Sequence, residues 1–126
     1  MANTIVNSPN APAPIGPYSH AVMAGNTLYI SGQIALDAES GNLVNDTIEA
    51  ETHQVMKNLK AILETAGMSL SDVAKCTIFV KDMNNFAKIN EIYGSYFTQN
   101  PPARETVEVS RLPKDVNVEI SAIAVK

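Results

Sequence analysis

The sequence contains few of the residues that build redox, metal and phosphate sites. Its 126 residues include one cysteine, Cys76, two histidines, His20 and His53, and six glycines spread along the chain. One cysteine cannot form an internal disulfide, which favours a reducing, cytoplasmic setting. The histidines are isolated, and no CxxC, HExxH, GxGxxG or P-loop motif is present. These absences exclude the common metal and nucleotide signatures, so we expect no metal and no cofactor.

Basic charge and long apolar runs are also scarce. Nine basic residues stand against 13 acidic ones, the net charge is −4, and the basic residues are scattered. Because nucleic-acid binding usually needs a clustered basic surface, this balance argues against RNA or DNA as a partner. No apolar run approaches the roughly 18 residues of a membrane span, and the N-terminal segment lacks the features of a signal peptide. We therefore expect no contact with a membrane.

The first third of the chain has the pattern of an irregular arm followed by a β-hairpin. Residues 7–17 contain four of the seven prolines, which predicts an extended or irregular segment. β-forming residues at 19–24 and 27–33 flank a Gly-Asn dipeptide, which predicts a hairpin. Gly32, inside the second strand, indicates a β-bulge or a close backbone approach. Strict alternation would place Gly32 on the face of Leu28 and Ile30, and Gln33 on the face of Tyr29 and Ser31.

Two amphipathic helices are predicted further along. Apolar residues recur at helical spacing over residues 48–66, after a capping-type Asp46 and before Gly67, a typical helix stop. A second helix begins at one of two adjacent asparagines and is ended by Pro101 and its neighbouring proline. With strands at 73–80, 104–110 and 116–125, the element order is β-β-α-β-α-β-β. This order predicts one α+β domain over residues 1–126, a mixed β-sheet with two α-helices packed on one face.

Apolar residues also point away from the predicted helices. Ile123 and Val125 alternate with Ala122 and Ala124 on the last strand, and Phe79 lies opposite Cys76 on another strand. Two helices can cover only one face of a sheet of this size, and a large exposed apolar patch is unusual for a monomer. We therefore expect a homo-oligomer that buries the second face.

Arg104 and Glu119 are the strongest candidates for chemistry. Arg104 begins a strand, and its planar fork suits a small carboxylate. Glu119 stands between Val118 and Ile120, so its carboxylate must be paired or functional. The two residues could equally form one structural ion pair. If the last two strands make a regular hairpin, a one-residue change of register decides whether they share a face, and contact between subunits could also join them. Asn90 either lines a polar cavity or caps a loop.

Several segments together resemble the reactive intermediate deaminase family, the RidA or YjgF proteins. They are PARETVEVSRLPKDVNVEI at 102–120, NAPAPIGPYS at 10–19, YISGQI at 29–34, FVKDMNNFAKIN at 79–90 and EISAIAVK at the end. The resemblance implies a chorismate mutase-like fold and a homotrimer with clefts between subunits. It also implies hydrolysis of 2-iminobutanoate and 2-iminopropanoate, reactive products of pyridoxal phosphate enzymes, to 2-oxo acids and ammonia.

The resemblance also assigns roles to residues. It makes Arg104 the clamp for the substrate carboxylate and Glu119 the acid that positions water, and it places around them Tyr18, Ser31, Gly32, Asn90 and the backbone carbonyl of Thr106. Many relatives have a small residue and then cysteine where this chain has Glu105 and Thr106. Glu105 is expected to add negative charge close to the anion site. The alternatives are a module that binds a small carboxylate without turnover and a ribonuclease or translation inhibitor.

Overall fold

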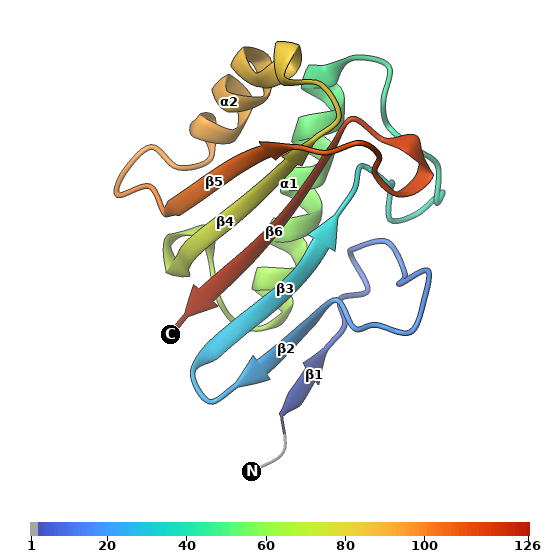
Figure 1. Cartoon of the computed structure of the whole chain (residues 1–126). Helices are drawn as coiled ribbons and strands as arrows, with labels where there is room; N and C mark the ends of the chain where they lie inside the picture. Colours follow the sequence, from blue (N-terminus) through green and yellow to red (C-terminus); the bar gives the residue numbers. More distant parts are fainter. Residues whose placement is uncertain (1–2) are drawn as a thin grey trace.

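The strands of the protein pair in the order β1-β2-β3-β6-β4-β5 to form one mixed sheet (Figure 1). The computed structural model describes residues 3–126, and no helix in that range is long and apolar enough to cross a membrane. The strands are β1 (Thr4–Val6), β2 (Ala21–Ala24), β3 (Thr27–Gln33), β4 (Val73–Val80), β5 (Ala103–Glu108) and β6 (Val118–Val125). The α-helices are α1 (Ile48–Thr65), which lies behind the sheet in Figure 1, and α2 (Phe86–Ser95), which is seen above β5 and contacts α1. The prediction of a mixed sheet with two helices on one face is confirmed.

The predicted hairpin of β2 and β3 is present and contains the bulge that Gly32 indicated. β3 pairs antiparallel with β6, and the register shifts between Ile30 and Gln33, so β3 has one extra residue there. The extra residue places Ser31 and Gly32 on the face away from the helices and returns Gln33 to the helix side, where it is 6% exposed. The predicted orientations of Gly32 and Gln33 are therefore both wrong, because a bulge reverses the alternation beyond it.

The helices follow the predicted periodicity but differ at their ends. The N-cap of α1 is Thr47, one residue later than predicted, and its Oγ1 accepts from the backbone N–H of Ala50 at 3.0 Å. Gly67 has φ +74° and ends the helix as expected. α2 ends at Ser95, well before Pro101, because tight turns of the 3₁₀ type close its last carbonyls.

The last two strands do not form a hairpin, which corrects the arrangement considered from the sequence. β4 lies between them, parallel to β5 and antiparallel to β6. The connection passes over the end of β4, where Val109 N–H donates to the Val80 carbonyl and Lys81 N–H donates to the Asn117 carbonyl. β5 is therefore an edge strand.

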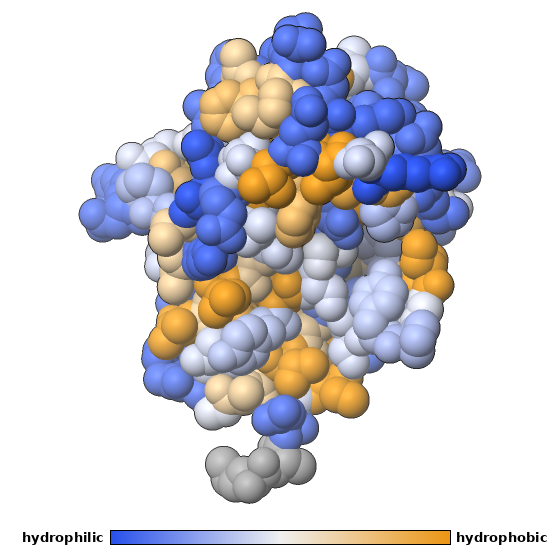
Figure 2. Space-filling view, viewed as in Figure 1, coloured by the Kyte–Doolittle hydropathy of each residue, from blue (hydrophilic) through white to orange (hydrophobic). Residues whose placement is uncertain are grey.

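The two faces of the sheet differ in burial. The helix-covered face holds the apolar core, which includes the fully buried Leu28, Ile78 and Ile120. The other face, called the open face below, carries Tyr29 at 51% and Val125 at 40% exposure. Figure 2 shows apolar surface exposed over these strands. The homo-oligomer expected to bury this face stays a prediction.

Candidate functional site

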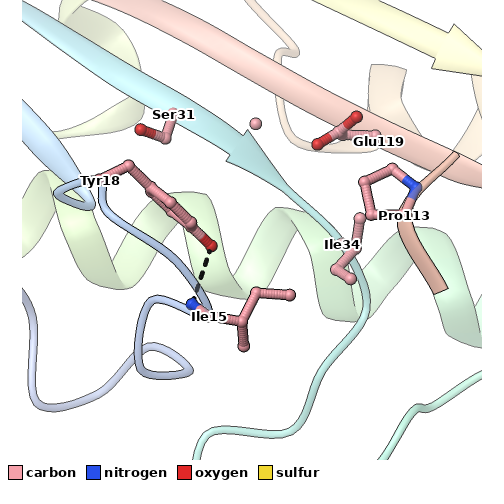
Figure 3. Close-up of a pocket in the computed structure, with 7 residues that line it drawn as sticks. Ile15, Tyr18, Ser31, Ile34, Pro113 and Glu119 are labelled. Carbon is pink, nitrogen blue, oxygen red and sulfur yellow. Dashed lines mark hydrogen bonds between the residues drawn. The ribbon is translucent and has the colours of Figure 1, made fainter.

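All of the predicted site residues except Thr106 line one of two clefts. The first has a volume of about 350 Å³ and opens on the sheet face away from the helices. Its lining is Ile15, Tyr18, Ser31, Gly32, Ile34, Pro113 and Glu119. Figure 3 shows side chains from the proline-rich arm, from β3 and from β6 around this common space. Four of the predicted residues, those at 18, 31, 32 and 119, are thus brought together.

A buried histidine holds the arm that carries Tyr18. The Nδ1 atom of His20 accepts the backbone N–H of Ser8 at 2.9 Å, so its Nε2 carries the proton and donates to the Pro12 carbonyl. At the cleft, the hydroxyl of Tyr18 accepts the backbone N–H of Ile15 at 3.4 Å (Figure 3). His20 therefore has a structural role, and it shapes one wall of the cleft through the arm.

The carboxylate of Glu119 projects from β6 into the gap left by Gly32. A Cβ atom at position 32 would lie only 2.6 Å from Glu119 Oε2, so the close approach needs glycine. Glu119 is half-buried, and this desolvation raises its pKa. Within residues 3–126 the ion pairs are Lys75–Glu105 and Lys81–Asp115, so Glu119 belongs to neither. Its raised pKa and lack of a cationic partner suit an acid that exchanges protons.

Arg104 lies on the opposite side of the sheet from Glu119. Arg104 of β5 is paired with Cys76, whose side chain is buried against the helices, whereas Glu119 is paired with Phe79, whose side chain alternates to the open face. The pairing therefore answers the question of register: the two residues do not share a face. A structural ion pair between Arg104 and Glu119 of the same chain is therefore excluded.

The second cleft surrounds Arg104 and has a volume of about 470 Å³. Its lining is Asn90, Tyr93, Gly94, Phe97, Pro101, Pro102 and Arg104. Arg104 Nη1 donates to Asn90 Oδ1 at 2.6 Å, and its guanidinium carbon lies 5.6 Å from the centre of the Phe86 ring. Asn90 thus faces the predicted clamp, as expected for a residue that lines a polar cavity.

Thr106 shares a face with Arg104 but lies deeper. Its Oγ1 is buried without a hydrogen-bond partner among the described residues, and so is the hydroxyl of Tyr93. Burial also raises the pKa values of Tyr93 and of the Cys76 thiol. Cys76 is 1% exposed, so the predicted inertness of this thiol fits its surroundings.

Glu105 points away from Arg104, which corrects the expectation that it adds negative charge to the anion site. Its carboxylate lies 3.1 Å from Lys75 Nζ and accepts the Thr77 hydroxyl at 3.1 Å. The hydrogen bond from Lys75 lowers the pKa of Glu105. Neighbouring residues of a strand project to opposite faces, so Glu105 lies on the open face.

Sequence reasoning missed the apolar members of both clefts. Ile34 and Pro113 line the first, and no local signal marks them, because they come from segments far apart in the sequence. Tyr93 lines the second, and it shares one face of α2 with Phe86 and Asn90. That spacing was a usable signal, since residues four and three apart are neighbours on a helix.

Comparison with known proteins identifies the family to which this sequence and fold are similar. The family described as Endoribonuclease L-PSP matches residues 8–126. A RutC family protein of Pyrococcus horikoshii is 57% identical, with 97% of each chain covered. A 2-iminobutanoate/2-iminopropanoate deaminase of Salmonella typhimurium is 47% identical over 100% of this chain and 99% of the relative. The crystal structure of the YjgF gene product of E. coli superposes with a TM-score of 0.94 at 45% identity and 98% coverage of each chain.

These matches confirm the resemblance and the chorismate mutase-like fold that it implied. They span the arm, the bulge, both helices and the strands that carry Arg104 and Glu119. The chain therefore belongs to the Endoribonuclease L-PSP family, the YjgF or RidA proteins.

Proposed function

We propose that this protein hydrolyses 2-iminobutanoate and 2-iminopropanoate to 2-oxo acids and ammonia. The observation that carries the proposal is the half-buried Glu119, which has a raised pKa and faces a cleft lined by Tyr18 and Ser31. The name of the Salmonella relative, which is 47% identical, supports the same reaction. The free thiol of Cys76 fits a cytoplasmic location.

The reaction needs few groups, because a protonated imine carbon is already a strong electrophile. Arg104 binds the substrate carboxylate and fixes the orientation of the imine carbon. Glu119 takes a proton from water while the water oxygen bonds to that carbon, which gives a carbinolamine. Glu119 then returns the proton to the nitrogen. The carbon–nitrogen bond breaks as the hydroxyl oxygen forms the carbonyl and gives its own proton to Glu119, so ammonia leaves and the 2-oxo acid remains. A positioned acid–base group of this kind accelerates a reaction by roughly 10²–10⁴-fold.

A site that uses both residues requires a second subunit. The two side chains lie on opposite faces of one sheet, and a four-carbon substrate cannot bridge them. β5 is an edge strand, so Arg104 is accessible to a neighbouring molecule. We propose a homotrimer in which Arg104 of one subunit completes the Glu119 cleft of the next. The exposed apolar side chains of the open face support such an interface.

The test couples threonine dehydratase to this protein and follows imine decay and 2-oxobutanoate formation. Arg104→Ala and Glu119→Gln should each abolish the acceleration while the trimer mass is kept. The two inactive variants are then unfolded together and refolded. In a trimer assembled at random from equal amounts, about one site in four draws both intact residues from neighbouring subunits, so about a quarter of the activity returns.

Each outcome separates one claim from the others. Full activity in both single variants sinks the deaminase assignment. If no activity returns in the refolded mixture, the proposal of a site shared between subunits is wrong. A monomeric mass in light scattering at micromolar concentration contradicts the trimer. Saturable 2-oxobutanoate binding without faster imine decay identifies a binding module. Cleavage of RNA by the wild type that survives both substitutions points to the ribonuclease alternative.

A further inference from the structure

Three side chains of α2 surround the guanidinium of Arg104. Asn90 accepts a hydrogen bond from Nη1 at 2.6 Å, and the guanidinium carbon lies 5.6 Å from the ring centre of Phe86 and 5.2 Å from that of Tyr93. Both distances lie within the range of cation–π attraction. The three residues belong to one helix, so they move together as a rigid support.

The hydrogen bond to Asn90 selects one edge of the guanidinium. Nη1 is the nitrogen on the side of Cδ, so an acceptor at Nη1 leaves the opposite Nε–Nη2 edge free. That edge presents two parallel N–H groups, which match a carboxylate in a bidentate, side-on pair. The aromatic rings restrict the plane of the group, and Asn90 restricts its rotation within that plane.

The positive charge of Arg104 also remains available to a bound anion. Asn90 is a neutral acceptor, so it orients the guanidinium without neutralising it. Glu108 is the acid on the same face of β5, and its Oε1 already accepts the backbone N–H of Met83 at 2.8 Å. Glu105 is held by Lys75 on the other face. The cation is therefore fixed in place and still free to pair with an anion.

We propose that Asn90 is a positioning residue that, with the rings of Phe86 and Tyr93, holds the Nε–Nη2 edge of Arg104 ready for the substrate carboxylate. The proposal rests on the proposed function for the identity of the anion. It differs from the role given to Asn90 by the family resemblance, which placed it at the pocket as a substrate-binding residue. An arginine that is ordered before binding loses less freedom on binding, which raises affinity.

The test observes the guanidinium directly. The chain has two arginines, Arg104 and Arg111, so the arginine Nε–H region of a ¹⁵N NMR spectrum holds two signals and is readily assigned with Arg104→Lys. In the wild type we expect the Arg104 signal to be ordered and shifted by the nearby rings, with Arg111 as the exposed internal reference. Asn90→Ala should make the Arg104 signal mobile. Asn84→Ala is the matched control, because Asn84 is exposed just before the helix and, within residues 3–126, its side chain makes no hydrogen bond to Arg104.

Affinity is measured in the same samples by titration with 2-oxobutanoate, the proposed product. Asn90→Ala should weaken binding and raise KM by about 3- to 10-fold, the effect of losing one charge-assisted hydrogen bond, with kcat within about twofold. Asn90→Asp keeps the acceptor but adds a negative charge, so it should restore the ordered Arg104 signal and still weaken binding.

Two results would overturn the proposal. One is an Arg104 signal as mobile as that of Arg111 in the wild type. The other is an Asn90→Ala variant whose Arg104 order and 2-oxobutanoate affinity match the wild type. If no variant binds 2-oxobutanoate or accelerates imine decay, the proposed function fails, while the NMR signals still decide whether Asn90 orders the guanidinium.

Discussion

Substitution of Gly32 by alanine tests the arrangement of Glu119 most directly. Gly32 lies at the bulge of β3 and does not have a positive φ, so the backbone itself accepts alanine. The added Cβ, however, would meet Glu119 Oε2 at 2.6 Å, Cδ at 2.9 Å and Cγ at 3.1 Å. Contacts between heavy atoms are favourable only at roughly 3.5–4.0 Å, so the carboxylate must move by about 1 Å.

The displacement should affect activity far more than stability. Turning a half-buried side chain away from its preferred rotamer costs about 0.5–1.5 kcal/mol, so we expect the free energy of unfolding to fall by about 1 kcal/mol. A misplacement of about 1 Å in a catalytic group can reduce the rate by about 10²-fold. Gly32→Ala should therefore be folded, trimeric and almost inactive.

The assay compares imine decay with urea unfolding for four proteins: wild type, Gly32→Ala, Glu119→Ala and the double variant. The stability cost of Gly32→Ala should vanish when Glu119 is already alanine, because the clash has gone. Gly94→Ala adds the same methyl where nothing lies within 4 Å, so it should not destabilise the helix. The reasoning is refuted if Gly32→Ala keeps wild-type activity, or if its stability cost is the same with and without the Glu119 side chain.

Three further predictions follow from burial. Burial raises the folded-state pKa of Glu119, so its contribution to stability is complete below the unfolded pKa and is lost as pH rises through the folded pKa. Glu119→Gln should therefore raise the free energy of unfolding at about pH 8 and leave it unchanged at about pH 3. Urea titrations of both proteins at the two pH values check this. Asn58 is 1% exposed and donates to the carbonyls of Ile34 and Leu36, so Asn58→Ala should cost about 2–4 kcal/mol in urea unfolding, and a loss under about 1 kcal/mol would contradict this. Cys76 should react with a thiol reagent only as fast as the protein opens, and rapid labelling of the native protein would show that this strand is accessible.

Local patterns in the sequence were sufficient for most elements. The strand predicted at 73–80 has the observed bounds, and the stripe of apolar residues predicted α1 to within one residue of its cap. Periods of 2 and 3.6 residues arise from the geometry of strands and helices themselves, so they can be read without knowing the partners. Alternation along the strand also predicts the orientation of Glu105, since a residue next to Arg104 in a strand must point to the other face.

The candidate site depended on contacts that local patterns do not encode. Gly32 indicated the bulge in the sequence. The orientation of Gln33 toward the helices, however, can be known only from the register between β3 and β6. From the sequence, the strands of Arg104 and Glu119 could have formed a hairpin and the register was left open, whereas β4 separates the two strands. Strand partners are chosen by packing between segments distant in the chain, and a one-residue change of register exchanges the faces.

The sequence by itself determined the elements, the family and the residue types that can bind a carboxylate and move a proton. Those properties follow from local periodicity and from the matching segments around Arg104 and Glu119. Only the tertiary structure decided that these two residues lie on opposite faces of one sheet, with Glu119 against Gly32 and Arg104 against α2. Strand order and register set which side chains meet, and both result from the packing of the whole chain.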